Sequence, residues 1–229
     1  MEVFEKFVSI ASLICEPTRA KMLWSLLDGR AYTASELSAV ADISASSASN
    51  HLAKLLEANI VKVEIQGRHR YYALANTEAA YAIEAMALLA KTDSMPITSE
   101  KKSPTGIKYC RTCYDHIAGF VGVQIVESME QKKYVEKQNN GYLVTQSGWH
   151  WLAHFNIFEQ NYERSRRPMT RQCLDWSERR PHLAGQLGAD LLQVMLERKW
   201  FKKIQFSREL AITVKGRHEM YELFGISVQ

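Results

Sequence analysis

The stretch "CRTCYDHIAG", residues 110–119, places three side chains that can bind a metal ion close together in the sequence. Cys110, Cys113 and His116 follow one another at intervals of three, which predicts that they lie on one face of a helix. Thiolate and imidazole are ligands that zinc prefers, and a thiol beside a histidine or an arginine is biased towards the reactive thiolate. The stretch therefore indicates chemistry based on a thiol and a histidine.

A repeat in the second half of the chain shows which of these residues have a counterpart. Residues 116–135 align without gaps on residues 182–201, and "RTCYD" before the first segment matches "RQCLD" before the second. We interpret this as a tandem duplication. Cys173 is the counterpart of Cys113, whereas Cys110 has none.

If the two copies face each other, their equivalent side chains converge at the junction. This candidate sensor site consists of Cys113, Cys173, His116 and His182. Three interpretations remain open: a zinc or copper site with two thiolates and two imidazoles, a dithiol switch, and ordinary packing of each side chain under a neighbouring helix. An enzyme with Cys113 as nucleophile and His116 as base is a weaker alternative, because the sequence shows neither an oxyanion site nor a third orienting group. The cofactor is not identified by the sequence.

Each copy is expected to form a helix, a hairpin and a second helix, and so to resemble a reduced winged fold. The hairpins are predicted around "QNNG" and "QFSRE", in units of about 107–160 and 168–229. Paired glycines, Gly119 with Gly122 and Gly185 with Gly188, predict a close crossing of the two repeated helices. An alternative sensor site is a pocket for an organic effector, lined by several tryptophans that include Trp176.

A proline-containing polar segment separates this region from the N-terminal part of the chain. Residues 92–106, "TDSMPITSEKKSPTG", have almost no apolar periodicity and are predicted to form an exposed linker. The expected domains are therefore residues 1–91 and a sensing or dimerising domain over 107–229.

The N-terminal domain contains the pattern of a helix, a turn and a second helix. Thr33 or Ser35 can cap the first helix, which carries Leu37 and Val40, and Ser44 can cap the second. The second helix carries apolar residues at 48, 52 and 55, but its other face is rich in serine and asparagine, which are poor helix formers. Such short polar side chains suit close contact with a nucleic acid. The following strands, "IVKVEI" and "HRYYAL", predict a hairpin with a basic tip.

Because of these motifs, the segment from about residue 5 to residue 90 resembles the ArsR/SmtB family of bacterial winged helix-turn-helix repressors. The resemblance is carried by "EPTRAKMLWSLL" and by "ELSAVADISASSASNHLAKLLEANIVKVEIQGRHRYYAL". It implies an α+β, mostly helical fold, a homodimer on double-stranded operator DNA, and repression relieved by an effector. The DNA contacts expected from the resemblance and the charge pattern are Ser46, Ser47, Ser49, Asn50, His51, Lys54, Arg68 and Arg70.

The sequence departs from the family at its known metal sites. The stretch "SELSAVADIS" lacks the cysteines of one site, and "NTEAAYAIEAMALLAK" lacks the histidine of the other. The resemblance therefore directs the search for an effector site to the duplicated region, where a ligand, a metal or an oxidant are all possible signals.

Composition sets wider bounds on the protein. The chain has 229 residues, 46% of them hydrophobic, and a net charge of +4, which permits a polyanionic partner. Neither a signal peptide nor an apolar run long enough to span a membrane is evident, so a cytoplasmic regulator without a membrane partner is expected. Four cysteines at uneven spacing favour thiols or metal ligands over disulfides in that compartment.

Overall fold

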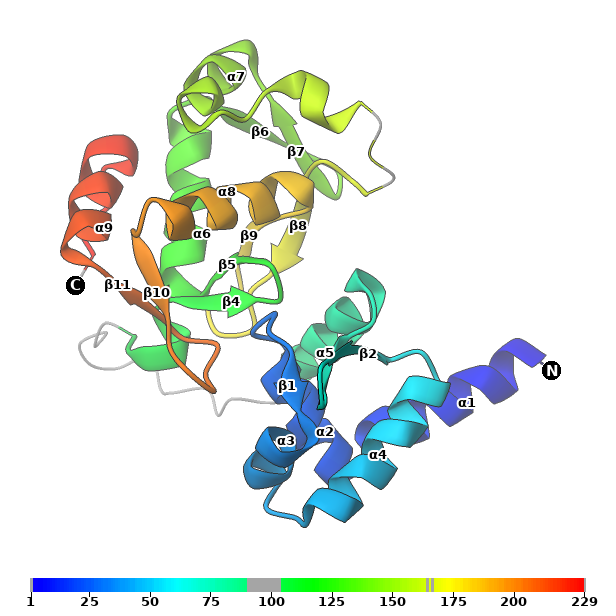
Figure 1. The fold of residues 1–229 in the computed structure, drawn as a ribbon. Coiled ribbons are helices and arrows are strands. Elements are labelled where there is room, and N and C mark those ends of the chain that lie inside the picture. The colour runs from blue at the N-terminus through cyan, green and yellow to red at the C-terminus, as the bar shows by residue number, and fades with distance from the viewer. Residues whose placement is uncertain (1, 90–103, 164, 166, 229) are drawn as a thin grey trace, which may run out of the picture. The chain divides into compact units, whose positions relative to one another are not determined.

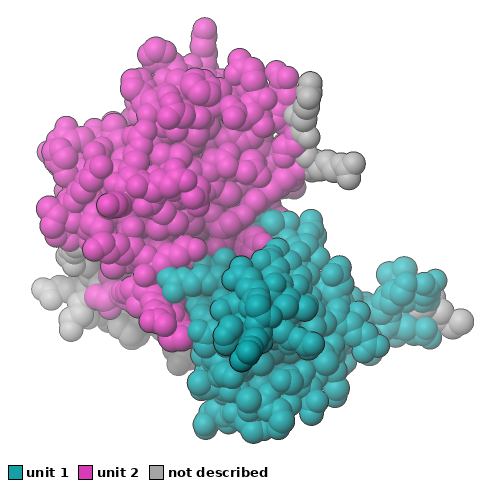
Figure 2. Space-filling view, viewed as in Figure 1, with its two compact units in different colours: residues 1–92 teal, residues 93–229 magenta. Residues whose placement is uncertain are grey.

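The computed structural model describes residues 2–89, 104–163, 165 and 167–228, which belong to two compact units. Unit 1 comprises Met1–Thr92 and unit 2 comprises Asp93–Gln229 (Figure 2). Most of the predicted linker, residues 92–103, lies outside the described residues. Within these residues no helix is long and apolar enough to cross a membrane.

Unit 1 is a winged helix-turn-helix (Figure 1). Its strands form one antiparallel sheet in the order β1-β3-β2, and β2 and β3 are the wing. The elements are α1 (Glu2–Cys15), α2 (Pro17–Leu26), β1 (Tyr32–Thr33), α3 (Ala34–Ala41), α4 (Ala45–Glu57), β2 (Val61–Gln66), β3 (His69–Leu74) and α5 (Thr77–Leu89).

Local capping explains where α3 and α4 begin. Thr33 caps α3 in a reciprocal capping box with Glu36, and the Ser44 hydroxyl accepts from the Ser47 amide at the start of α4. Between the helices, Asp42 adopts a left-handed conformation with φ of 57°, which ends α3 and reverses the chain. The predicted caps at Thr33 and Ser44 are therefore present.

The core of unit 1 follows the predicted helical periodicity with one exception. Leu37 is buried, as are Ala48, Leu52 and Leu55 on α4. Val40, which we expected on the buried face, is 39% exposed because only one side of α3 packs against the unit. Cys15 is exposed at the last residue of α1.

Unit 2 contains the same order of elements twice, namely a hairpin, a helix, a second hairpin and a second helix (Figure 1). Its first half contains β4 (Arg111–Cys113), β5 (His116–Ala118), α6 (Gly119–Gln131), β6 (Val135–Gln138), β7 (Gly141–Val144) and α7 (Gln146–Leu152). Its second half contains β8 (Arg171–Leu174), β9 (Pro181–Ala184), α8 (Gln186–Glu197), β10 (Phe201–Lys203), β11 (Leu210–Ile212) and α9 (Val214–Glu219). Short helical turns occupy Gly106–Lys108, Ala153–Phe155, Glu159–Tyr162 and Met220–Phe224.

The first hairpin of each half corrects the predicted helix around Cys110, Cys113 and His116. Cys113 ends β4 and His116 begins β5, so the two residues face each other across a two-residue turn. Tyr114 in that turn has φ of 60°, which interrupts any helix at this point. Strand pairing instead satisfies the backbone of these buried residues. The spacing of three residues between Cys113 and His116 therefore belongs to a hairpin and not to one face of a helix.

The paired glycines also act differently from the prediction. A Cβ atom at Gly122 would lie 2.5 Å from the carbonyl oxygen of Ile117, and one at Gly188 would lie 2.6 Å from that of Leu183. Each glycine thus lets a helix approach the hairpin of its own half, whereas the prediction was a close crossing of the two helices. The other packing partner of each helix is the hairpin of the opposite half, since α6 packs against β9 and α8 against β5.

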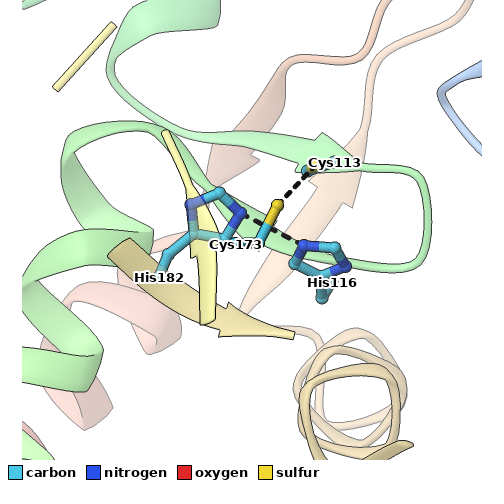
Figure 3. Close-up of side chains that lie close together, drawn as sticks. All are labelled: Cys113, His116, Cys173 and His182. Carbon is cyan, nitrogen blue, oxygen red and sulfur yellow. Dashed lines mark hydrogen bonds between the residues drawn. The ribbon is translucent and has the colours of Figure 1, made fainter. Parts of the chain in front are cut away.

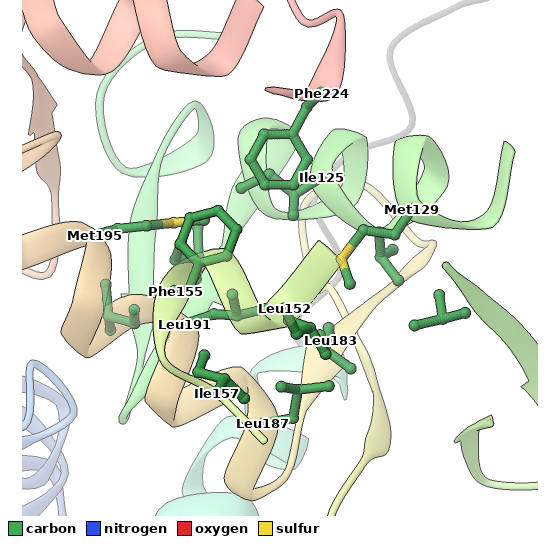
Figure 4. Close-up of a cluster of buried hydrophobic side chains, with 14 of the residues drawn as sticks. Ile125, Met129, Leu152, Phe155, Ile157, Leu183, Leu187, Leu191, Met195 and Phe224 are labelled. Carbon is green, nitrogen blue, oxygen red and sulfur yellow. The ribbon is translucent and has the colours of Figure 1, made fainter. Parts of the chain in front are cut away.

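One hydrophobic core runs through both halves of unit 2. Figure 4 draws members of this core from both halves, among them Ile125 and Met129 from α6 and Leu187, Leu191 and Met195 from α8. Trp151 and Trp200, two of the tryptophans considered for an effector pocket, are buried members of this core, as is Phe155. They stabilise the unit by packing against one another.

Candidate functional site

The two hairpins that open the halves of unit 2 bring together the four predicted side chains (Figure 3). Cys113 and His116 are opposite each other in β4 and β5, and Cys173 and His182 are opposite each other in β8 and β9. Because β5 also contacts β9, each hairpin presents one thiol and one imidazole to the same point. We call these four side chains the Cys/His cluster.

The atoms of the Cys/His cluster that can bind a metal are very close together. The sulfur atoms of Cys113 and Cys173 are 3.8 Å apart, and the Nε2 atoms of His116 and His182 are 3.1 Å apart. All four candidate ligand atoms lie within 4.8 Å of one another. Cys113, His116 and His182 are almost fully buried, whereas Cys173 is only partly buried. The cluster is therefore compact, with its more open side at Cys173.

A carboxylate lies next to the outer nitrogen of each imidazole. The Nδ1 atom of His116 donates to Oδ1 of Asp115 at 3.1 Å, and Nδ1 of His182 lies 3.4 Å from Oδ2 of Asp175. Both rings therefore direct Nδ1 towards an aspartate and Nε2 towards the centre of the cluster. This arrangement is typical of histidines that bind metal ions, in which a carboxylate fixes the ring orientation.

Each aspartate is held in turn by an arginine, Asp175 by Arg111 of the opposite half and Asp115 by Arg167 of the segment that connects the two halves. Arg111 Nη2 donates to Asp175 Oδ2 at 2.7 Å, with both side chains fully buried, and Arg167 Nη1 donates to Asp115 Oδ2 at 2.6 Å. Asp175 also accepts from the backbone amide of Gly119 at 2.7 Å. The bonds to Asp175 cross the junction between the halves, so they fix the position of one hairpin relative to the other.

The charges around the cluster shift the pKa values of its acids and bases. Burial disfavours the charged form of Asp175, but Arg111 and His182 outweigh it and hold the pKa of that carboxyl well below its usual range. Burial also opposes protonation of His116, but Cys113 and Asp115 outweigh it and raise the pKa of His116 to about 9. Without a bound cation, His116 therefore carries a proton at neutral pH.

Cys110, which the sequence singled out together with Cys113 and His116, lies outside this arrangement. Cys110 is buried in the hydrophobic core, and burial raises the pKa of its thiol. The pairing of Asp115 with Arg167 was not predicted, because Arg167 lies in an arginine-rich connector without a counterpart in the first half.

In unit 1, most of the predicted DNA contacts lie on exposed surfaces of α4 and the wing. Ser47 is half-buried near the start of α4. A groove between α4 and the wing is lined by Ser49, Arg68 and Arg70, among other residues. The exposed predicted contacts are Ser46, Ser49, Asn50, Lys54, Arg68 and Arg70.

His51 differs from the other predicted contacts on α4. Its Nδ1 atom lies 3.4 Å from Oε2 of Glu16 and 3.4 Å from Nη1 of Arg19, and the side chain is 22% exposed. Arg19 itself donates to the backbone carbonyl of Leu13. This nitrogen of His51 therefore links α4 to the start of α2.

Comparison with known proteins gives a helix-turn-helix match within unit 1 and one relative that is similar over most of the chain. A family described as "Helix-turn-helix domain" matches residues 15–64. The helix-turn-helix transcriptional regulator YdfF of Bacillus subtilis is 41% identical over 208 residues, which cover 91% of this chain and 92% of YdfF. The regulator CmtR of Mycobacterium tuberculosis is 33% identical over 90 residues, covering 38% of this chain and 75% of CmtR. The structure of reduced HlyU from Vibrio cholerae is 28% identical, with a TM-score of 0.36, over 39% of this chain and 93% of that chain.

Proposed function

Because the chain belongs to the family of helix-turn-helix transcriptional regulators, we propose that it binds an inverted-repeat operator as a homodimer and releases the operator when unit 2 receives a signal. The observation that carries this proposal is the presence of a polar recognition helix and basic wing in unit 1 together with a buried Cys/His cluster in unit 2. Release of the operator on a signal makes the protein a repressor.

The exposed face of α4 supports direct reading of a DNA sequence. Asn50 is exposed in the middle of the helix, where an amide side chain can pair with an adenine edge in the major groove. Arg68 and Arg70 are exposed at the tip of the wing, where guanidinium groups suit phosphate oxygens. We therefore assign sequence specificity to Asn50 and general affinity to the wing.

The N-terminal helix supports assembly of two copies. Three large apolar side chains of α1, Val3, Phe4 and Phe7, are 82%, 68% and 66% exposed. They lie at helical spacing on a helix of 14 residues, so they form one apolar stripe. Contact between the α1 stripes of two chains would bury these side chains and would pair two recognition helices, as an inverted repeat requires.

The location of the cluster supports unit 2 as the sensor. The segments that form α3 and α5 contain neither cysteine nor histidine, so the family's known metal sites have no equivalent ligands there. Unit 2 instead concentrates two thiols and two imidazoles at a junction of secondary elements. We assign it no enzymatic reaction, because Cys113 is 2% exposed and directed at Cys173.

Operator binding by the full chain tests the proposal. We expect Asn50→Ala to weaken binding to the operator by about 1–3 kcal/mol while leaving binding to random DNA unchanged. Arg68→Ala should weaken binding to both DNAs alike and reduce the dependence on salt. Lys21→Ala, an exposed lysine on α2, serves as the control and should change neither.

Fluorescence anisotropy with an operator selected from random sequence gives these affinities across a range of salt concentrations. Equal losses on operator and random DNA for both Asn50→Ala and Arg68→Ala would contradict the roles assigned to α4 and the wing. A regulator that keeps its operator affinity under every metal, oxidant and thiol-reactive treatment would contradict the sensing role of unit 2.

A further inference from the structure

We propose that the Cys/His cluster binds one divalent metal ion of the zinc class, held tetrahedrally by Cys113, His116, Cys173 and His182, which joins the two halves of unit 2. The coordination itself rests on the geometry of these residues alone. Only its consequence for DNA binding rests on the function proposed above.

The distances between the ligand atoms match a tetrahedral site. Zinc lies about 2.3 Å from thiolate sulfur and about 2.0–2.1 Å from imidazole nitrogen. At tetrahedral angles these lengths place the two sulfur atoms about 3.8 Å apart and the two nitrogen atoms about 3.3–3.4 Å apart. The corresponding distances between the cysteines and between the histidines are 3.8 Å and 3.1 Å. The thiol pair and the imidazole pair are therefore each spaced much as in a tetrahedral site, and all four ligand atoms lie within 4.8 Å of one another.

The orientation of the two imidazoles points to a cation between them. Asp115 and Asp175 lie beside the Nδ1 atoms, which favours a proton on Nδ1 of each ring. Nε2 of each ring is therefore the ligand atom that faces the centre of the cluster, and the two Nε2 atoms are 3.1 Å apart. A metal ion placed between the rings binds both Nε2 atoms at once.

Charge balance favours a divalent ion over other occupants. Two thiolates supply two negative charges and the neutral imidazoles supply none, so a divalent cation gives a neutral buried centre. The nearby aspartates are balanced by Arg111 and Arg167. Four protein ligands close the coordination sphere, which is typical of structural and regulatory sites.

The cluster needs both halves of unit 2. Each hairpin supplies one cysteine and one histidine, so neither hairpin alone offers more than two ligands. Binding therefore stabilises the arrangement in which β4–β5 and β8–β9 face each other. Binding or loss of the metal would therefore change the position of one hairpin relative to the other. A sensor can transmit such a movement to the rest of the protein.

Cobalt(II) substitution of the reduced full-length protein tests the coordination. We expect one equivalent of Co²⁺ per chain, with the ligand-field bands of a tetrahedral ion and a charge-transfer band from thiolate to cobalt. Zn²⁺ should displace it. Cys113→Ser and Cys173→Ser should each lose the charge-transfer intensity of one thiolate and weaken Co²⁺ binding at least tenfold. Cys15→Ser, which changes an exposed cysteine of unit 1, is the matched control and should bind like the unchanged protein.

A second measurement uses only the unchanged protein, so it does not depend on the folding of a variant. With Zn²⁺ bound, only the exposed Cys15 should react quickly with a thiol reagent, because Cys110 is buried in the core. After chelation the reaction should become faster for two further cysteines, identified by mass spectrometry as Cys113 and Cys173, while Cys110 stays slow. Octahedral Co²⁺ spectra, the absence of Co²⁺ binding by the reduced protein, or a Cys113–Cys173 disulfide in place of metal in freshly isolated protein would overturn the proposal. The last result would assign the site to thiol oxidation.

The consequence for regulation is measured separately, by operator affinity with Zn²⁺ and with chelator. A tenfold difference between the two supports a metal-dependent regulator. Tetrahedral Co²⁺ binding without any difference in operator affinity refutes metal as the signal but leaves the metal site established. Operator release by an oxidant or an organic ligand in a protein that binds no Co²⁺ refutes the metal site alone.

Discussion

Replacing Arg111 by methionine should destabilise unit 2 by about 3–4 kcal/mol. The guanidinium of Arg111 is fully buried against the carboxylate of Asp175, so the change leaves a buried carboxylate without its counter-charge. Removing one partner of such a pair costs about 3–5 kcal/mol. The lower part of this range applies, because Asp175 keeps the amide of Gly119 and the hydroxyl of Ser177 as donors. Loss of the Arg111 stacking on Trp176, at 4.4 Å, adds about 1 kcal/mol.

Urea denaturation of the full chain, followed by tryptophan fluorescence, measures this loss. Four of the five tryptophans, at positions 149, 151, 176 and 200, lie in unit 2, so the signal reports mainly on that unit. Chelator and reductant keep metal binding and oxidation from contributing. Arg180→Met is the control, because Arg180 pairs with Glu127 at the surface and the two side chains are 47% and 30% exposed. An exposed pair contributes less than about 1 kcal/mol.

A double-mutant cycle separates the ion pair from the other effects of each change. Asp175→Asn alone leaves Arg111 charged and buried, whereas the double variant Arg111→Met with Asp175→Asn carries neither charge. Its loss should be smaller than the sum of the two single losses by about 2 kcal/mol. Additive losses, or a loss for Arg111→Met no greater than that for Arg180→Met, would refute the view that this pair holds the two hairpins together.

Three further outcomes follow from the structure. Gly148→Ala and Gly216→Ala should each lower the unfolding free energy of unit 2 by about 1–3 kcal/mol in urea denaturation, because the added Cβ atoms would lie 2.0 Å and 2.1 Å from backbone carbonyl oxygens. Phe4→Glu combined with Phe7→Glu should convert a dimer into monomers in sedimentation velocity and weaken operator binding; an unchanged sedimentation coefficient would count against α1 as the interface. Thr33→Ala should cost unit 1 about 1 kcal/mol in thermal unfolding, since it removes the capping box of α3, and no change in melting temperature would contradict that role.

The winged helix could be predicted from the sequence because its signals are local. Thr33 and Ser44 each cap the helix that follows them, and Ala48, Leu52 and Leu55 repeat at the period of a helix. Each of these signals involves residues a few positions apart, so no knowledge of the tertiary structure was needed. Only Val40 was misplaced, since periodicity does not tell how wide the buried face of a short helix is.

The first hairpins of unit 2 could not be predicted in the same way. The strands β4 and β5 are three residues long and buried on both faces, so they show no alternation of apolar and polar residues. A spacing of three between Cys113 and His116 fits both a helix and a tight hairpin. The convergence of the Cys/His cluster was nevertheless predictable, because it depended on the repeat and not on the type of element.

The buried ion pairs bear on how a metal in the cluster would act. In small zinc domains, folding depends on the metal because little else holds the chain together. Here the two halves share a hydrophobic core, and the ion pairs of Arg111 with Asp175 and of Arg167 with Asp115 add contacts that do not need a metal. Unit 2 would therefore keep its two halves together without the metal. Binding of the metal would change how the two hairpins fit against each other, while the unit stays folded in both states. A tenfold change in operator affinity needs only about 1.4 kcal/mol of coupling, which a shift between two packed arrangements can supply.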